Sequence, residues 1–349
     1  MKVLVTGTDG YIGSQLAPFL AARGHEVVGL DTGFYRDGLL YGDADPGGTT
    51  IRKDIRHLEV ADLEGCDAVV HLAELSNDPL GQHNPQITFQ INHLGSVHLA
   101  KLCREAGVRR FVYTSSCSVY GVGTDAIMSE ESTPNPQTAY AECKVMVERD
   151  VQTLAGDYFS PTFLRNATAF GASPRMRFDI VLNNLAGLAW TTGTIAMTSD
   201  GTPWRPLVHV LDICEAIACT LAAPPETVHN QIFNVGDSRF NYRVREIATV
   251  VADAFPGCNV TFGKPDSDNR SYRVSFEKIA EHLPDFACSR DAATGARELY
   301  EIFKSIQMSV ETFEFRAFTR LKQIRYLLET GQVDNDLFWR VAAPVQTGS

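Results

Sequence analysis

The 349-residue chain has no run of about 18 apolar residues, which is roughly the shortest stretch that spans a membrane as a helix. It also has no two cysteines in a C-x-x-C spacing; its eight cysteines are scattered along the chain. We therefore expect no membrane span, no metal site and reduced, mostly buried thiols. The first residues enter a strand pattern directly, which leaves no room for a signal peptide. These features together predict a cytoplasmic protein.

The chain also has fewer basic than acidic residues: 31 Lys and Arg against 42 Asp and Glu, which gives a net charge of −11. This balance opposes a general affinity for nucleic acid or for an anionic membrane, so neither is expected as a partner. A small anion could still be held by a local cluster of arginines. Hydrophobic residues make up 44% and charged residues 21% of the chain, which is typical of a globular protein. The length allows two lobes.

The first thirty residues form the most informative stretch. An apolar run at 2–5 is followed by T-G-T-D-G-Y-I-G, which contains Gly7, Gly10 and Gly13, then by a helical pattern and a second apolar run at 26–30. Glycines in such a turn let the backbone approach a diphosphate closely, and the helix N-terminus adds N–H groups. Asp31 follows Gly13 by 18 residues, near the spacing of about 20 at which a carboxylate binds an adenine-side ribose. The pattern predicts dinucleotide binding; a tight turn that binds nothing is the alternative.

Strand and helix patterns alternate through the first half of the chain, which predicts an α/β fold with a Rossmann-like, doubly wound parallel sheet. We expect residues 1–171 to form the nucleotide-binding domain and 205–236 to return to its sheet. Residues 172–204 and 237–349 would form a smaller C-terminal α/β lobe that binds the substrate. A helix predicted near 311–330 carries a basic face, which we expect to be solvated or paired with acidic neighbours: Arg316, Arg320, Lys322 and Arg325.

Two residues on one predicted helix suggest acid–base chemistry. Tyr140 and Lys144 are four residues apart, so they share a helix face. A phenol with a pKa near ~10 is a poor base at neutral pH, but a neighbouring ammonium stabilises the phenolate and lowers that pKa. An oxidised nicotinamide ring would lower it further, and Lys144 could reach the nicotinamide ribose. The alternative is a surface Tyr and Lys that happen to lie one turn apart.

A hydroxyl-rich turn precedes this helix. Ser116 lies in T-S-S-C-S-V-Y-G, directly after a predicted strand and 24 residues before Tyr140. Ligands bind at the carboxyl ends of strands in open α/β sheets, so Ser116 could hydrogen-bond a substrate hydroxyl or carbonyl. For Ser115 and Ser118, hydrogen bonds to local backbone groups are a reasonable alternative.

With these motifs combined, the sequence resembles the extended short-chain dehydrogenase/reductases that act on nucleotide-linked sugars. The matching motifs span nearly all of residues 1–171: TGTDGYIG, Asp31, Asp54-Ile55-Arg56, His71-Leu72-Ala73, Asn92, SSCSVYG and YAECK. The resemblance implies that Ser116, Tyr140 and Lys144 are catalytic and that the cofactor is NAD, although Arg36 keeps a 2′-phosphate conceivable. Asn92 matches a residue that supports the active site, with a polar kink in a packed helix as the alternative. The cofactor residues it implies are Gly7, Gly10, Tyr11, Ile12, Gly13, Asp31, Asp54, Ile55, Leu72, Ala73, Tyr140 and Lys144.

The second half of the chain is similar to this family more loosely. Thr168 stands where the family commonly has an Asn beside the sugar diphosphate, and Pro206 replaces its usual Asp. The substrate residues implied for a nucleoside-diphosphate sugar are Ser116, Thr168, Asn184, Arg205 and Arg270. Asn183 competes with Asn184 in register, surface ion pairs are the alternative for the arginines, and Arg175 and Arg177 are weaker anion candidates. The family usually forms homodimers through the helices expected near 86–106 and 140–154.

The departures from the family narrow the reaction. Related 4,6-dehydratases carry Thr-Asp-Glu where Ser116, Cys117 and Ser118 stand, and several sugar-acid decarboxylases carry Glu at the position of Ser118. Without these acids, the resemblance favours NAD-dependent epimerisation, at C4, through a transient keto intermediate with Tyr140 as the base. An NAD(P)H-dependent keto-sugar reductase would use the same residues. A non-catalytic NAD-binding protein on the same fold is a further alternative.

Overall fold

The structure is a computed structural model that describes residues 1–42, 49–76, 84–122, 127–264 and 271–340. In this part of the chain a seven-stranded sheet, parallel throughout, runs in the order β11-β7-β5-β4-β1-β2-β3. The expected Rossmann-like, doubly wound sheet is therefore confirmed. Its strands are β1 (Lys2–Thr6), β2 (Glu26–Asp31), β3 (Thr49–Arg52), β4 (Ala68–His71), β5 (Arg110–Ser116), β7 (Ser160–Asn166) and β11 (Gln231–Val235).

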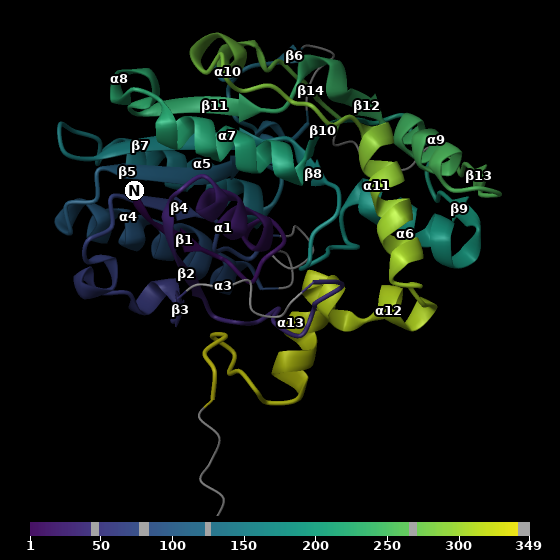
Figure 1. Ribbon diagram of the computed structural model, residues 1–349, viewed down its shortest axis with the longest axis horizontal. Helices are drawn as coiled ribbons and strands as arrows, with labels where there is room; N and C mark the ends of the chain where they lie inside the picture. The colour runs from purple at the N-terminus through teal and green to yellow at the C-terminus, as the bar shows by residue number, and fades with distance from the viewer. Residues whose placement is uncertain (43–48, 77–83, 123–126, 265–270, 341–349) are drawn as a thin grey trace, which may run out of the picture.

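Helices cover both faces of this sheet (Figure 1). Because successive side chains of a strand point to opposite faces, Val3 and Val5 pack on one side and Leu4 on the other. The first side is covered by α1 (Gly13–Ala22) and α7 (Val210–Ala222), and the second by α4 (Ser96–Glu105) and α5 (Ala139–Gln152). A sheet buried on both faces explains why its strands are apolar runs without alternation.

A second lobe is built mainly from segments that follow β7 in the chain. Its hydrophobic core joins α6 (Val181–Thr192), α9 (Val244–Ala254) and α11 (Ala292–Ser305) to a three-stranded sheet of order β12-β10-β8. The strands of that sheet are β8 (Thr168–Phe170), β10 (Trp204–His209) and β12 (Asn241–Arg243). The prediction that all of 205–236 returns to the central sheet is too broad, because only β11 pairs there, with β7. Strand β10 instead pairs with β8 and β12.

Shorter elements complete the described chain. Two-stranded pairings join β9 (Thr194–Ala196) to β13 (Asn259–Thr261) and β6 (Ile127–Met128) to β14 (Arg273–Val274). The remaining helices are α3 (Pro85–Thr88), the π-helix η3 (Phe89–Gly95), α8 (Pro225–Val228), α10 (Glu277–His282), α12 (Val310–Glu314) and α13 (Arg320–Glu329). Short 3₁₀ turns are η1 (Ile55–His57), η2 (Val60–Leu63), η4 (Cys117–Tyr120), η5 (Ser238–Phe240) and η6 (Arg316–Phe318). Of the helices described, none has the length and apolar character needed to cross a membrane.

The C-terminal segment from α13 to residue 340 returns to the nucleotide-binding domain, not to the second lobe. Ile324 and Leu327 are buried in the same cluster as Leu30 and Phe34, and Figure 1 shows this yellow segment beneath β2 and β3. Phe338 stacks on His57 with ring centroids 4.6 Å apart. The assignment of all of 237–349 to the substrate lobe is therefore wrong for this segment.

On the basic face expected here, Lys322 and Arg325 are exposed and Arg316 pairs with an acid, as predicted, and only Arg320 differs. Arg320 is only 3% exposed and lies over the ring of Tyr35 at 4.0 Å, so it is neither solvated nor at the surface. Arg316 pairs with the exposed Asp37.

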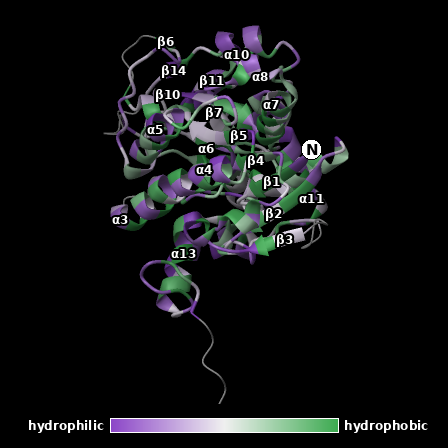
Figure 2. Cartoon of the chain, turned by 90° about the vertical axis from the view of Figure 1, so that its left-hand side faces the viewer, coloured by the Kyte–Doolittle hydropathy of each residue, from purple (hydrophilic) through white to green (hydrophobic). Residues whose placement is uncertain are grey.

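In Figure 2 the helices around the sheet carry hydrophobic residues (green) and hydrophilic residues (purple) side by side, as amphipathic helices do.

Because Ile324 is fully buried against the nucleotide-binding domain, Ile324→Ala should lower the free energy of unfolding by about 2–5 kcal/mol. Urea unfolding followed by circular dichroism measures this loss. The matched control is Lys322→Ala on the exposed face of the same helix, which should change stability by less than about 0.5 kcal/mol. Equal, small effects of both substitutions would contradict the packing described.

Candidate active site

One cavity of about 1210 Å³ lies at the carboxyl ends of the central strands and extends to the second lobe. It brings together most of the residues that the sequence singled out, from both halves of the chain. They are Gly7, Gly10, Tyr11, Ile12, Gly13, Asp31, Asp54, Ile55, Leu72, Ala73, Ser116, Tyr140, Lys144, Thr168 and Arg205. Asn184 is not part of the lining; its Nδ2 donates to the Phe178 carbonyl at 2.9 Å. Arg270 lies outside the described residues.

The glycine turn between β1 and α1 requires residues without a Cβ. Gly7 has a φ of +78°, and a Cβ there would press on the backbone of Leu72 and Ala73. A Cβ at Gly13 would overlap the carbonyl oxygen of Gly7. The turn therefore forms a cradle of backbone that lines the cavity at the start of α1, which suits the diphosphate of a dinucleotide. Tyr11 fastens the turn to the second lobe, since its hydroxyl donates to the Gly171 carbonyl at 2.7 Å.

Asp31 ends β2 beside this cradle and is 8% exposed. Its carboxylate accepts hydrogen bonds from the backbone N–H groups of Asp9 (3.0 Å) and Gly33 (2.7 Å). Burial and the neighbouring Asp9 charge raise the pKa of Asp31 to about 6, against these two hydrogen bonds. The carboxylate lines the cavity and is placed to accept hydroxyl groups of a ribose.

Helix α5 carries Tyr140 and Lys144 into the cavity on one face, as their spacing predicts. The helix begins where the Thr138 hydroxyl accepts a hydrogen bond from the Ala141 N–H at 3.2 Å, which is a favourable N-cap. The Lys144 Nζ lies 5.4 Å from the centroid of the Tyr140 ring. An ammonium at this distance favours the phenolate over the phenol.

Ser116 ends β5 and caps the 3₁₀ turn η4, where its Oγ accepts from the Ser118 N–H at 3.1 Å. Its neighbour Cys117 is turned away from the cavity, and its Sγ donates to the Arg165 carbonyl at 3.1 Å. Burial raises the pKa of the Cys117 thiol well above its usual range. The turn therefore presents hydroxyl groups, and no carboxyl group, to the cavity.

Sequence reasoning left Asn166 without a role and gave Ser118 and Arg177 only weak ones, although all three line this cavity. Ser118 Oγ and Asn166 Oδ1 are buried atoms that line it and have no hydrogen-bond partner within the described residues. Arg177 pairs with Asp179 at 2.8 Å and also lines the cavity, whereas Arg175 binds the Arg36 carbonyl instead. Glu74 had a signal that could have been used, because it is a charged residue directly after the matched His71-Leu72-Ala73 motif.

The sheet, the glycine cradle and the Ser, Tyr and Lys side chains in one cavity define an enzyme of the extended short-chain dehydrogenase/reductase type. The chain belongs to the NAD dependent epimerase/dehydratase family, whose model matches residues 3–236. NAD is the cofactor of this family, and the residues of the cradle fit it. The predictions of an enzyme, of this family and of NAD are thereby confirmed.

Individual relatives differ in their reactions. The chain is 31% identical over 318 residues to a UDP-glucose 4-epimerase of Mycolicibacterium smegmatis, covering 86% of this chain and 92% of that protein. It is 28% identical over 298 residues to UDP-glucuronic acid decarboxylase 1 of Arabidopsis thaliana, covering 81% and 65%. The solved structure of MoeE5 in complex with UDP-glucuronic acid and NAD aligns with a TM-score of 0.75 at 28% identity, covering 87% of this chain and 99% of that one.

The position of Asp31 predicts a pH dependence of NAD binding. The ionised carboxylate accepts through both oxygens, whereas protonation turns one oxygen into a donor and removes the charge. Because the pKa of Asp31 is about 6, NAD affinity should fall as the pH drops through 6. Calorimetric titration of the protein with NAD across this range measures the effect. The Asp31→Asn variant should bind NAD more weakly at neutral pH, and its NAD affinity should change little as the pH drops through 6. Asp37→Asn, an exposed acid of the same loop, is the control; a flat wild-type profile would contradict the role of Asp31.

Proposed function

We propose that the protein catalyses the NAD-dependent epimerisation of a nucleoside-diphosphate sugar at C4. The observation that carries this proposal is that one cavity holds the glycine cradle, the Ser116, Tyr140 and Lys144 side chains, and Arg205 of the second lobe. A cofactor in the cradle and a sugar nucleotide held by the second lobe can therefore meet beside Tyr140. The 4-epimerase names of several relatives support the same reaction.

The residues divide into two binding sets. The cradle, Asp31 and the residues that line the cavity after β3 and β4 would hold NAD, while Ser116, Thr168 and Arg205 would hold the sugar nucleotide. A planar guanidinium suits a phosphate oxygen, which makes Arg205 the expected diphosphate contact. When bound, NAD supplies hydride acceptance and return at the sugar carbon.

Proton transfer falls to Tyr140. As the phenolate, it accepts the proton of the sugar C4 hydroxyl while Ser116 holds that oxygen by a hydrogen bond. Loss of this proton and of the hydrogen on C4 leaves a keto sugar, which turns within the cavity. Tyr140 then returns its proton to the oxygen as hydrogen is restored to the opposite face of C4. Lys144 keeps its ammonium beside the phenol throughout, so the base is regenerated in each cycle.

The turn after β5 argues against two other reactions of the family. Dehydration and decarboxylation in the similar enzymes use acids at the positions of Cys117 and Ser118. Here Cys117 is buried away from the cavity and Ser118 offers only a hydroxyl. A keto-sugar reductase would use the same Ser116, Tyr140 and Lys144, and differs in consuming the reduced cofactor. A non-catalytic binder has no need for all three side chains.

Two further features extend the proposal. All eight cysteines are free thiols and six are buried, which fits a reducing, cytoplasmic setting.

We also infer a homodimer through the helices around 86–106 and α5, where Leu94 is 58% exposed. Light scattering of the purified protein should give twice the monomer mass, and Leu94→Glu should return the monomer.

The reaction can be tested with a panel of nucleotide sugars incubated without added cofactor. Appearance of the C4 stereoisomer with the total NAD unchanged supports epimerisation, whereas turnover only with added NAD(P)H would replace it by reduction. Tyr140→Phe should lower kcat by about 10²- to 10⁴-fold or more, because the base is lost, while NAD binding persists. Tyr158→Phe, at a tyrosine that is 78% exposed, is the matched control. A fully active Tyr140→Phe enzyme would refute the assigned base.

A further inference from the structure

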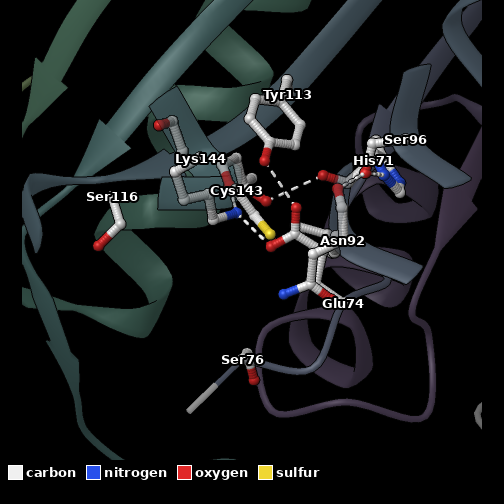
Figure 3. Close-up of polar contacts among 12 residues, drawn as sticks. His71, Glu74, Ser76, Asn92, Ser96, Tyr113, Ser116, Cys143 and Lys144 are labelled. Atoms are coloured by element: carbon white, nitrogen blue, oxygen red, sulfur yellow. Dashed lines mark hydrogen bonds and ion pairs between the residues drawn. The ribbon is translucent and has the colours of Figure 1, made fainter. Parts of the chain in front are cut away.

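The loop after β4 places the carboxylate of Glu74 against the ammonium of Lys144. The Glu74 side chain is 2% exposed, and its Oε2 lies 2.5 Å from the Lys144 Nζ, whose own side chain is 3% exposed. Its other oxygen accepts a hydrogen bond from the Tyr113 hydroxyl at 2.6 Å. Figure 3 shows both contacts converging on the Glu74 carboxylate, with Ser116 apart from them.

Lys144 is therefore held from two sides. Its ammonium forms an ion pair with Glu74 and donates to the carbonyl of Thr114 in β5. Burial lowers the pKa of Lys144, but Glu74, together with Tyr140 and Glu148, outweighs this effect, so the pKa is raised and the ammonium is kept. Burial in turn raises the pKa of Glu74, against the opposing effect of Lys144.

The loop that carries Glu74 is itself fixed by Asn92. The Asn92 side chain accepts from the Leu75 N–H at 2.8 Å and donates to the Leu75 carbonyl at 3.1 Å. Asn92 is fully buried in the π-helix η3, a geometry that is frequent at functional sites. Asn92 therefore holds Leu75, and with it the adjacent Glu74, in place against Lys144.

We propose that Glu74 is a positioning residue for Lys144 and that its negative charge sets the pH at which Tyr140 becomes a base. The carboxylate anchors the ammonium 5.4 Å from the Tyr140 ring, and its negative charge opposes the field of the ammonium there. This inference rests on the roles proposed for Tyr140 and Lys144.

The direction of the effect follows from charge. Tyr140 and Lys144 lose protons as a coupled pair, and a negative charge beside the pair raises the pH at which its first proton leaves. Removing that charge lowers this pH, whichever member carries the proton. Within the described residues, the other titratable or charged groups around the pair are His71 at the end of β4, Tyr113 in β5, Cys143 and Glu148 in α5, and Arg177 before α6.

The Glu74→Gln variant removes the negative charge but keeps the shape of the side chain, because the glutamine amide can still accept a hydrogen bond from Lys144 and contact Tyr113. The acid limb of the kcat/KM profile should move to lower pH by about 1 unit or more. The tyrosinate absorbance that is lost in the Tyr140→Phe background should titrate with the same shift. Glu74→Asp keeps the charge farther from Lys144 and should shift both profiles less. Glu74→Ala also removes the anchor, so its kcat should fall about 10-fold or more below that of Glu74→Gln.

Asp212→Asn is the matched control, since Asp212 is 1% exposed and pairs with Arg290 instead of Lys144; it should leave both profiles in place. Unchanged profiles in Glu74→Gln and Glu74→Asp, with NAD binding intact, would overturn the inference. If Glu74→Gln does not fold, Glu74→Asp alone decides. The tyrosinate titration needs no substrate, so it tests Glu74 even if the wild-type protein epimerises no sugar and the proposed function fails.

Discussion

The common direction of the seven central strands is the constraint on which the site depends. Because all of them are parallel, their carboxyl ends lie along one edge, and the loops that leave β1, β2, β4, β5 and β7 there line one cavity. Residues from Gly7 to Asn166 meet at this edge although they are far apart in the sequence. The second lobe completes the lining of this cavity, for example with Arg205 from β10.

Charged groups at this edge are buried in pairs. Lys144 with Glu74, Arg165 with Glu148, and Arg177 with Asp179 each place a cation and an anion within 2.5–2.8 Å, with little exposure to water. Such pairs add little net stability, because removing both charges from water costs about as much as their attraction returns. One effect of each pair is geometric, since each partner restricts the other to one position. For Lys144 this fixes the ammonium beside the phenol.

The parts of this site that sequence predicts are those set by local rules. The glycine turn, the shared face of Tyr140 and Lys144, and the alternation of strands and helices each follow from neighbouring residues, and each is found in the structure. The position of Glu74 after the matched motif marks it as a candidate, but its ion pair with Lys144 does not follow from local rules, because the two residues are 70 positions apart. The pairing of β10 with β8 and the burial of Arg320 likewise depend on contacts between distant segments.

The return of the C-terminal segment to the first domain has a consequence for how the chain is made. Ile324, Leu327, Val333 and Leu337 complete a hydrophobic cluster whose other buried members, including Leu30 and Phe34, lie between Leu4 and Phe163. During synthesis the ribosome releases the N-terminal residues first, and domains generally fold as units in that order. The first domain therefore emerges with part of its core uncovered, and this surface is buried only after residues 324–337 have been translated.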